Sequence, residues 1–250
     1  MKEKKEKKDN SPRIPQRDKI KGSLELKPFP WTERQKAFLD CALSKDTRLV
    51  FVAGPAGSTK TILAVYAALT MINEHRVSDM MYIRAAVESA KKSLGFLPGT
   101  LDEKMSVYGT PLEEKLDELT TKEGKAFLIK DKRVQTIAVN YLRGQSWNSR
   151  IAVIDEAQNL EEEELYTVLT RIGKFSKGFI LADSSQCDLP KSKAGGFDKL
   201  SKWFTSPDNG CYFFQLEKTD ILRDELTKYL VERYELLKQI EAGQAASGKF

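Results

Sequence analysis

Eight consecutive residues, Gly-Pro-Ala-Gly-Ser-Thr-Lys-Thr at 54–61, have the types and the spacing of a phosphate-binding loop. Glycines allow backbone N–H groups to turn toward phosphate oxygens. Lys60 would place its charge on the β- and γ-phosphates, and Thr61 would offer its hydroxyl to Mg²⁺. We therefore expect a nucleotide to contact the whole loop: Gly54, Pro55, Ala56, Gly57, Ser58, Thr59, Lys60 and Thr61.

The residues on either side of this loop fit that role. Residues 48–53 form a short apolar run typical of a buried strand, and residues 60–71 repeat apolar positions at helical spacing. A helix that begins at the loop adds unpaired N–H donors and a favourable dipole. The alternative is a glycine-bearing turn before an ordinary core helix.

Thr59 departs from the usual loop pattern, G-x-x-x-x-G-K-[ST], because it occupies the position of the second glycine. Its Cβ would crowd the phosphates if the backbone had to follow the glycine conformation. The threonine is tolerated if this residue, at the start of a helix, adopts a negative φ. Both possibilities stay open at the level of sequence.

A second group of candidate catalytic residues follows two further apolar runs. Residues 150–156 end in the adjacent carboxylates Asp155 and Glu156, where ligands bind in open α/β sheets. We expect Asp155 to join Thr61 around Mg²⁺, and Glu156 to orient or deprotonate an attacking water. Gln186, after the predicted strand 178–182, would detect the γ-phosphate through that water. The alternatives are a helix N-cap for the two carboxylates and a turn position for Gln186.

The segment before the loop contributes one more candidate. Thr32 is a plausible N-cap for a helix that ends near Leu43, with Gln35 at the third helical position of a capping box. The amide of Gln35 also has the geometry to form two hydrogen bonds with an adenine edge. Cap and adenine contact are both possible.

Strands and helices alternate along the chain, which predicts an α/β fold with a mostly parallel sheet covered on both faces. We expect strands at 48–53, 79–84, 134–140, 150–156, 178–182 and 211–216. We expect helices at 31–43, 60–71, 101–108, 111–121, 161–171, 196–204 and 224–242, the last of them amphipathic.

Charge divides the chain into two parts. Residues 1–21 hold 9 basic and 4 acidic residues, so the remaining chain holds 41 − 9 = 32 basic and 36 − 4 = 32 acidic residues. We expect residues 1–22 to be a disordered basic tail, which either attracts a polyanion or only solubilises the chain, and residues 23–250 to form one domain.

No apolar run reaches the roughly 20 residues that span a bilayer, and the three cysteines are far apart, which indicates a cytoplasmic protein with reduced thiols.

These motifs occur in an order that is similar to a known family. The loop 54–61, R-A-A-V-E with L-G-F-L-P-G, Y-L-R-G, V-I-D-E-A-Q-N and D-S-S-Q-C-D-L-P resemble the PhoH-like, phosphate-starvation-inducible ATPases over about residues 30–235. The resemblance implies a RecA-like P-loop core related to superfamily 1 helicases. It also implies ATP hydrolysis and a role in RNA or DNA metabolism.

The resemblance also assigns roles by position. Gln35 is similar to an adenine-reading glutamine, residues 54–61 to the phosphate loop, and Asp155 with Glu156 to the Walker B motif. Gln186 matches a γ-phosphate-sensing glutamine, and Arg223, in D-I-L-R, looks like an arginine that reaches the γ-phosphate. Ala85 replaces a proline that is common in the family.

Three functions fit this sequence. The leading one is an Mg²⁺-dependent ATPase that acts on nucleic acid, with Arg84 and Arg143 as candidate phosphate contacts. The second is a nucleotide-dependent switch or assembly protein that hydrolyses slowly and performs no work on nucleic acid. The third, a small-molecule kinase, is least favoured because Asp-Glu-Ala-Gln at 155–158 suits water activation better.

Helicases that this family resembles close their ATP site with an arginine from a second RecA-like domain. The 60 residues after Pro190 are too few for a second domain of typical size, so the arginine comes from the chain's own C-terminal segment or from a neighbour. A head-to-tail ring provides it from the next subunit, and the family resemblance implies a hexamer. We favour Arg223 in this role, with Arg171 as the second candidate.

Overall fold

Six parallel strands form one sheet in the order β3-β2-β4-β5-β1-β6, which confirms the predicted α/β class. The computed structural model describes residues 24–85, 101–137, 139, 146–222 and 225–247. The strands are β1 (Leu49–Ala53), β2 (Asp79–Arg84), β3 (Val134–Ile137), β4 (Arg150–Asp155), β5 (Lys177–Ala182) and β6 (Cys211–Gln215).

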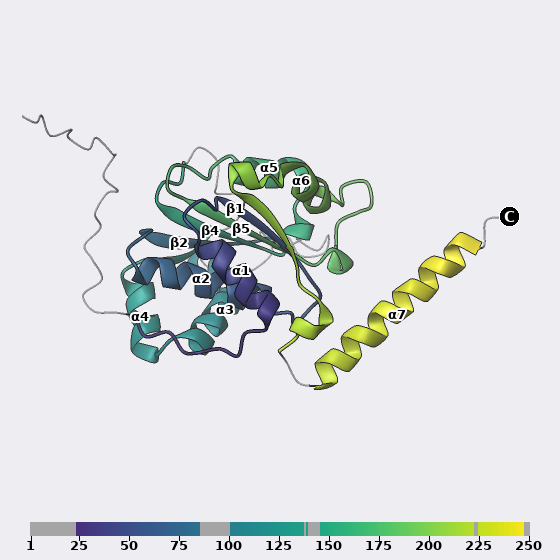
Figure 1. Cartoon of the computed structure of the whole chain (residues 1–250), viewed down its shortest axis with the longest axis horizontal. Helices are drawn as coiled ribbons and strands as arrows, with labels where there is room; N and C mark the ends of the chain where they lie inside the picture. Colours follow the sequence, from purple (N-terminus) through teal and green to yellow (C-terminus); the bar gives the residue numbers. More distant parts are fainter. Residues whose placement is uncertain (1–23, 86–100, 138, 140–145, 223–224, 248–250) are drawn as a thin grey trace, which may run out of the picture.

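Helices cover both faces of this sheet (Figure 1). One face carries α1 (Glu33–Leu43), α2 (Lys60–Asn73), α3 (Leu101–Leu119) and α4 (Lys122–Lys130). The other carries α5 (Glu162–Leu169) and α6 (Gly196–Phe204). The last helix, α7 (Glu225–Ser247), extends away from the sheet and its covering helices.

The strand sequences explain why there are two hydrophobic cores. Side chains alternate between the faces of a strand, so Val50 and Val52 pack with the helices of the α1 face while Phe51 packs on the α6 face. Strands buried on both faces consist of near-continuous apolar residues, as β1, β4 and β5 do. The cores hold the carboxyl ends of the strands, and therefore the candidate site residues, at one edge of the sheet.

The prediction of two helices at 101–108 and 111–121 was wrong. They form the single helix α3, with Pro111 inside it. Proline usually breaks a helix because it lacks an N–H donor and its ring crowds the preceding turn. Leu112, Leu116 and Leu119 lie on one buried stripe beyond the proline, and their burial favours a continuous helix.

Other differences from the predicted elements are small. Helix α4 was not anticipated; Thr121 caps it by accepting a hydrogen bond from the Gly124 N–H at 3.1 Å. Strand β3 is described only as far as Ile137, and most of the predicted turn after it lies outside the described residues.

None of the described helices combines the length and the apolar character needed to cross a bilayer. Cys41, Cys187 and Cys211 are free thiols, as predicted.

Candidate functional site

The phosphate-loop segment connects the end of β1 to the start of α2, as predicted. Gly54 has no room for a side chain, because a Cβ there would lie 2.8 Å from Ser58 Oγ and 2.9 Å from Leu216 Cβ. Gly57 has a φ of 79°, a left-handed conformation that favours glycine. These two glycines therefore fold the chain into a tight loop at the N-terminus of α2, where unpaired N–H groups are available for an anion.

Lys60, the first residue of α2, lies over its own loop. Its Nζ donates hydrogen bonds to the Gly54 carbonyl at 2.6 Å and to the Pro55 carbonyl at 3.0 Å. Burial lowers the pKa of Lys60, and the carboxylates of Asp183, Asp155 and Glu156 oppose that shift. A cation held by two neutral carbonyls in a partly desolvated site is suited to exchange them for phosphate oxygens.

Thr61, at the start of α2, and Asp155, at the end of β4, are in contact although 94 positions separate them in the sequence. The Thr61 hydroxyl lies 3.2 Å from Asp155 Oδ1 and 3.1 Å from Oδ2. The fully buried Tyr82 donates its hydroxyl to Asp155 Oδ2 at 2.5 Å. Burial, reinforced by the negative charge of Asp155, raises the pKa of Tyr82, so its hydroxyl stays a donor. Asp155 is therefore oriented from β2 as well as from α2.

Glu156 follows Asp155 with a left-handed φ of 56°, and each of its carboxylate oxygens has a partner. Gln158 Nε2 donates to Oε2 at 2.6 Å, and Arg84 Nη2 lies 3.8 Å from Oε1. Gln158 is held in turn, because its Oε1 accepts the Asp183 N–H at 3.0 Å. The carboxylate is therefore positioned by the ends of β2, β4 and β5. The two carboxylates do not cap α5, whose N-cap is Glu161, so that alternative was wrong.

A cavity of about 280 Å³ brings the predicted residues together. Gln186 is exposed in a short 3₁₀ turn, Ser184–Gln186, and borders this cavity. Phe29, Lys115 and Glu118 close other sides. The predicted site residues that line it are Ala56, Gly57, Thr59, Lys60, Thr61, Asp155, Glu156 and Gln186.

Gln35 is fully buried and does not line this cavity. Its role in the capping box with Thr32 is confirmed. Its Nε2 donates to Thr59 Oγ1 at 2.8 Å and to the Asp220 carbonyl at 2.9 Å. Gln35 therefore supports the phosphate loop from behind. A contact with adenine stays a prediction. Because Gln35 Oε1 already accepts the Thr32 N–H at 2.9 Å, two hydrogen bonds to an adenine edge would require bonds at both ends of the amide to be exchanged.

Thr59 does not have the negative φ that would make a threonine easy to accommodate. Its φ is 63° and its ψ is 18°, in the left-handed region. A β-branched residue is disfavoured there because its side chain crowds the backbone. The Thr59 hydroxyl donates to the Ser58 carbonyl at 2.6 Å and accepts the bond from Gln35, and these contacts stabilise the conformation. The backbone thus keeps the glycine conformation of the motif without the glycine.

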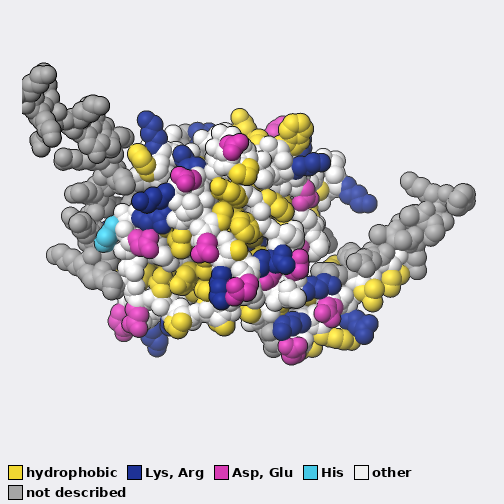
Figure 2. Space-filling view, viewed as in Figure 1, with side chains coloured by type: hydrophobic (Ala, Val, Ile, Leu, Met, Phe, Trp, Pro, Cys, Tyr) yellow, Lys and Arg dark blue, Asp and Glu magenta, His cyan; other side chains and the backbone are white. Residues whose placement is uncertain are grey.

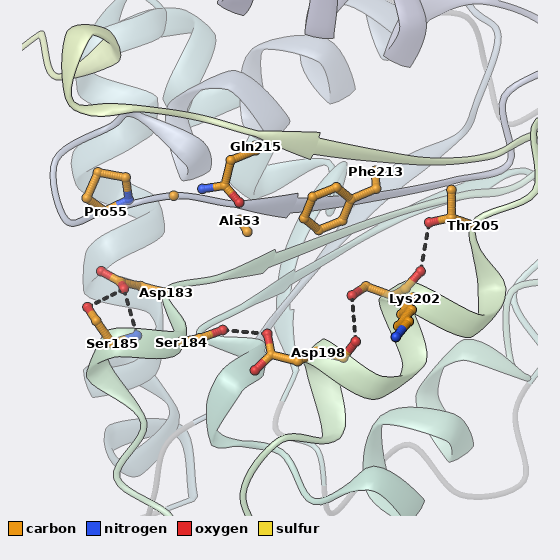
Figure 3. A pocket seen from close by; sticks show the side chains of 12 residues that line it. Ala53, Pro55, Asp183, Ser184, Ser185, Asp198, Lys202, Thr205, Phe213 and Gln215 are labelled. Atoms are coloured by element: carbon orange, nitrogen blue, oxygen red, sulfur yellow. Dashed lines mark hydrogen bonds between the residues drawn. The ribbon is translucent and has the colours of Figure 1, made fainter. Parts of the chain in front are cut away.

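A second cavity, of about 640 Å³, adjoins the loop on the side of α6 (Figure 3). Gly54 and Pro55 border it, together with Phe213 and Gln215 of β6. Asp183 lines both cavities; its Oδ1 accepts bonds from Ser185, while its buried Oδ2 has no hydrogen-bond partner among the described residues. An unpaired carboxylate oxygen near Lys60 makes Asp183 part of the site's electrostatics.

Sequence reasoning assigned no individual role to three of these residues: Tyr82, Gln158 and Asp183. Asp183 and Gln158 did carry a signal, since each follows the end of a strand that also delivers a predicted site residue. Tyr82 carried none beyond being a polar side chain in an apolar strand.

The structure describes two of the four predicted arginines, Arg84 and Arg171. Arg84 ends β2 and faces Glu156. Arg143 and Arg223 lie outside the described residues. Arg171 follows α5 beside Ile172, which pairs with Trp147 just before β4 begins. Arg171 is therefore at the amino edge of the sheet, opposite the phosphate loop of its own chain.

Comparisons with known proteins agree with this geometry. The family model for PhoH-like proteins matches residues 29–235. The chain belongs to the PhoH-like family. It is 34% identical to a PhoH-like protein of Bacillus subtilis strain 168 over 194 residues, which are 78% of this chain and 60% of that protein. It is 33% identical to a PhoH-like protein of Mycobacterium leprae over 214 residues, 86% of this chain and 60% of the relative.

A third PhoH relative, Protein PhoH of Escherichia coli K12, is 30% identical over 208 residues, 81% of this chain and 56% of that protein. The family resemblance predicted from the motifs is confirmed, and the match includes every predicted site residue. The PhoH-like family is one of P-loop ATPases, which supports nucleotide binding at the loop. The chain spans about 60% of the length of these relatives.

Proposed function

We propose that this PhoH-like chain is an Mg²⁺-dependent ATPase that couples hydrolysis to the binding or remodelling of nucleic acid, with RNA as the first candidate. The observation that carries the proposal is the convergence of Lys60, Thr61, Asp155 and Glu156 on one cavity. Lys60 and Thr61 begin α2, and Asp155 and Glu156 lie at the end of β4, so side chains suited to phosphate binding, metal binding and water activation border the same cavity.

The donor set supports a magnesium ion. Thr61 and Asp155 offer oxygen atoms about 3 Å apart. Among the described residues, no group of three or more His, Cys, Asp or Glu side chains forms a metal cluster. Mg²⁺ suits such a sparse site, because it keeps several waters and takes further ligands from substrate phosphates. Bound there, it would neutralise charge on the phosphates during transfer.

Glu156 is the residue that would activate the attacking water. Its carboxylate borders the cavity and is positioned by Gln158, so its orientation is fixed before a substrate arrives. A carboxylate in that position can accept a proton from an attacking water, while Lys60 offsets charge on the γ-phosphate. Gln186, at the edge of the same cavity, would orient the water.

The second function, a slow nucleotide-dependent switch, has one observation in its favour. Both carboxylate oxygens of Glu156 already have partners, Gln158 and Arg84, and these contacts compete with an attacking water for the carboxylate. Turnover would then be slow until Arg84 leaves Glu156 and pairs with another anion. A nucleic-acid phosphate at Arg84 would supply one, so the two functions differ in whether nucleic acid stimulates hydrolysis.

We also propose that an arginine of a second copy completes the site, in a ring that the family resemblance makes a hexamer. The position of Arg171 supports a contact in trans, because it lies at the sheet edge opposite its own loop. Arg223 stays the preferred candidate. It precedes α7, whose placement away from the sheet is compatible with a neighbouring copy.

Two substitutions test the ATPase. Lys60→Ala should weaken ATP binding, since it removes the charge on the phosphates. Glu156→Gln should bind ATP but lower turnover by about 10²-fold or more, because it removes a positioned base. ATP binding and steady-state hydrolysis would be measured with and without Mg²⁺, and with single-stranded RNA or DNA added.

The exposed α4 variants Lys122→Ala and Glu123→Gln are matched controls and should behave as wild type. Normal turnover in Glu156→Gln would refute the assignment of the base. Hydrolysis that neither RNA nor DNA stimulates would favour the switch.

A further inference from the structure

Helix α7 has an apolar stripe that the described part of the chain leaves uncovered. Leu226, Leu230, Leu237 and Ile240 are 64%, 55%, 49% and 48% exposed, and their spacing puts them on one side of the helix. Hydrophobic side chains are visible along α7 in Figure 2. Soluble monomers rarely expose contiguous apolar surface on this scale, so the stripe indicates a contact with another surface.

A second uncovered apolar surface lies between α5 and α6, on the face of the sheet that these two helices cover. Trp203 is 77% exposed and Tyr166 is 53% exposed, and they border a groove of about 450 Å³ with Leu200 and Phe204. Figure 2 shows hydrophobic side chains protruding over these two helices. Exposed aromatic side chains of this kind are typical anchors of protein interfaces.

The charges of the two surfaces are complementary. Arg233 lies within the apolar stripe of α7, with its guanidinium carbon 5.3 Å from the Tyr229 ring centroid. The first turn of α5 is acidic, and two of its residues, Glu162 and Glu163, line the groove. Glu162 is already paired with Lys199, which also lines the groove, at 2.7 Å, so the carboxylate left for Arg233 is that of Glu163. A helix that enters the groove can therefore bury its leucines on the aromatic residues and pair its arginine with Glu163.

The chain's own groove is a poor partner for α7. The segment before α7 is fixed to the α1 face, because Asp220 accepts a hydrogen bond from the Thr32 hydroxyl at 2.5 Å and from Gln35 at 2.9 Å. Residues 221–224 are the whole link to α7, and four residues span at most about 14 Å. The groove lies across the sheet from that anchor.

A coiled coil of two α7 helices fits less well than the groove. The stripe repeats at alternating steps of four and three residues, which is the coiled-coil period, but Arg233 occupies one of the seam positions. In a parallel pair the two arginines would face each other in an apolar seam. The groove provides the carboxylate of Glu163 instead.

We propose that α7 of one copy docks in the α5–α6 groove of a second copy. This is the helix-in-groove mode of recognition, with leucines at helical spacing as anchors. The two surfaces differ, so the contact is head-to-tail and each copy keeps one free helix and one free groove for further copies. The pairing concerns contacts between copies and does not depend on whether the chain hydrolyses ATP.

The test uses full-length variants with one surface disabled. Leu230→Glu with Leu237→Glu disables the stripe, and Trp203→Glu disables the groove. All three positions are exposed, so the fold should persist, as circular dichroism would verify. Mass would be measured by light scattering across a concentration series. The wild-type chain should form assemblies larger than a dimer, and each variant alone should be monomeric.

Mixing the two variants gives the decisive result. The intact groove of one can accept the intact helix of the other, so the mixture should form one-to-one dimers that grow no further. Lys228→Glu, on the other side of α7, and Lys202→Glu, on the part of α6 that lines the other cavity, should assemble as wild type.

Three outcomes would overturn the proposal. A wild-type chain that stays monomeric at all concentrations would exclude the contact. A Trp203→Glu variant that still assembles would indicate pairing of α7 with itself. A mixture that remains monomeric would show that the two surfaces do not recognise each other.

Discussion

At the scale of single residues, the phosphate loop contains a threonine, Thr59, where the usual motif has a glycine, and hydrogen bonds of its hydroxyl make the exchange tolerable. Thr59 adopts the left-handed backbone that glycine would adopt, and its hydroxyl is bonded on both sides. The conformation costs roughly 1–2 kcal/mol for a residue with a Cβ. A hydrogen bond contributes about 1 kcal/mol, so the two bonds offset much of that cost.

Variants of Thr59 separate these two contributions. Thr59→Gly removes the backbone strain but also the bond to Gln35, so its free energy of unfolding should stay within about 1 kcal/mol of wild type. Thr59→Ala keeps the strain and loses the bonds, so it should be less stable than Thr59→Gly by about 1–2 kcal/mol. Urea denaturation measures the order, and an alanine variant as stable as the glycine variant would contradict it. We expect no gain in ATP turnover from glycine.

Tyr82 is the residue that orients the predicted metal ligand. Tyr82→Phe removes its hydroxyl bond to Asp155, which should weaken Mg²⁺ binding about 10-fold, as for other residues that support a ligand from behind. The readout is the Mg²⁺ concentration that gives half-maximal ATPase activity. Tyr212→Phe, on β6, is the matched control. An unchanged Mg²⁺ requirement in Tyr82→Phe would mean that the contacts of Asp155 with Thr61 and with the Glu156 N–H orient it without Tyr82.

At the scale of elements, a buried lysine joins the end of α1 to the start of β5. Lys177 is 7% exposed, and its Nζ donates to the backbone carbonyls of Ala42, at 2.9 Å, and Ser44. These carbonyls end α1, where a helix has unpaired acceptors. Burial lowers the pKa of Lys177 to about 8, with a further contribution from the nearby charge of Arg76.

This lysine predicts a pH dependence of stability. Its pKa is about 8 in the folded chain and 10.5 in the unfolded chain, so the unfolded chain binds more protons between those values. Stability should therefore rise with pH from about 8 to 10.5 through this residue. In Lys177→Met that contribution should vanish, while the exposed Lys174→Met should retain it. Chemical denaturation at several pH values measures the difference, and identical profiles for both variants would exclude Lys177 as its source.

At the scale of the whole molecule, excess positive charge is confined to one end of the sequence. Residues 1–21 carry a net charge of 9 − 4 = +5, and the rest of the chain has none. If this segment binds nucleic acid, affinity should fall steeply with salt, because each neutralised phosphate of a single strand releases a counterion and adds about 0.7 to the slope.

Deleting residues 1–21 should therefore flatten the dependence of RNA affinity on salt. The full-length chain with the nine basic residues of this segment changed to glutamine should behave like the deletion. Fluorescence anisotropy with labelled single-stranded RNA measures both at several salt concentrations. Equal slopes for the wild type and the two variants would assign the phosphate contacts to other residues, such as Arg84.

The sequence by itself determined the local features. The capping box at Thr32, the loop at 54–61 and most of the strands depend on neighbours within a few positions, so periodicity and residue type were sufficient. The alternation of strands and helices was enough to predict the α/β class, because parallel strands need crossover helices. Rules of local propensity failed at Pro111, where burial of the leucines that follow it in α3 overrides the proline.

Only the tertiary structure decided how the site is supported. Tyr82 reaches Asp155 across 73 positions and Gln158 reaches Asp183 across 25, so no short motif records either contact. The conformation of Thr59 likewise depends on Gln35, 24 positions away on another helix. These contacts exist because the parallel sheet brings the carboxyl ends of β2, β4 and β5 to one edge, and the pairing of those strands is fixed by packing on both faces of the sheet.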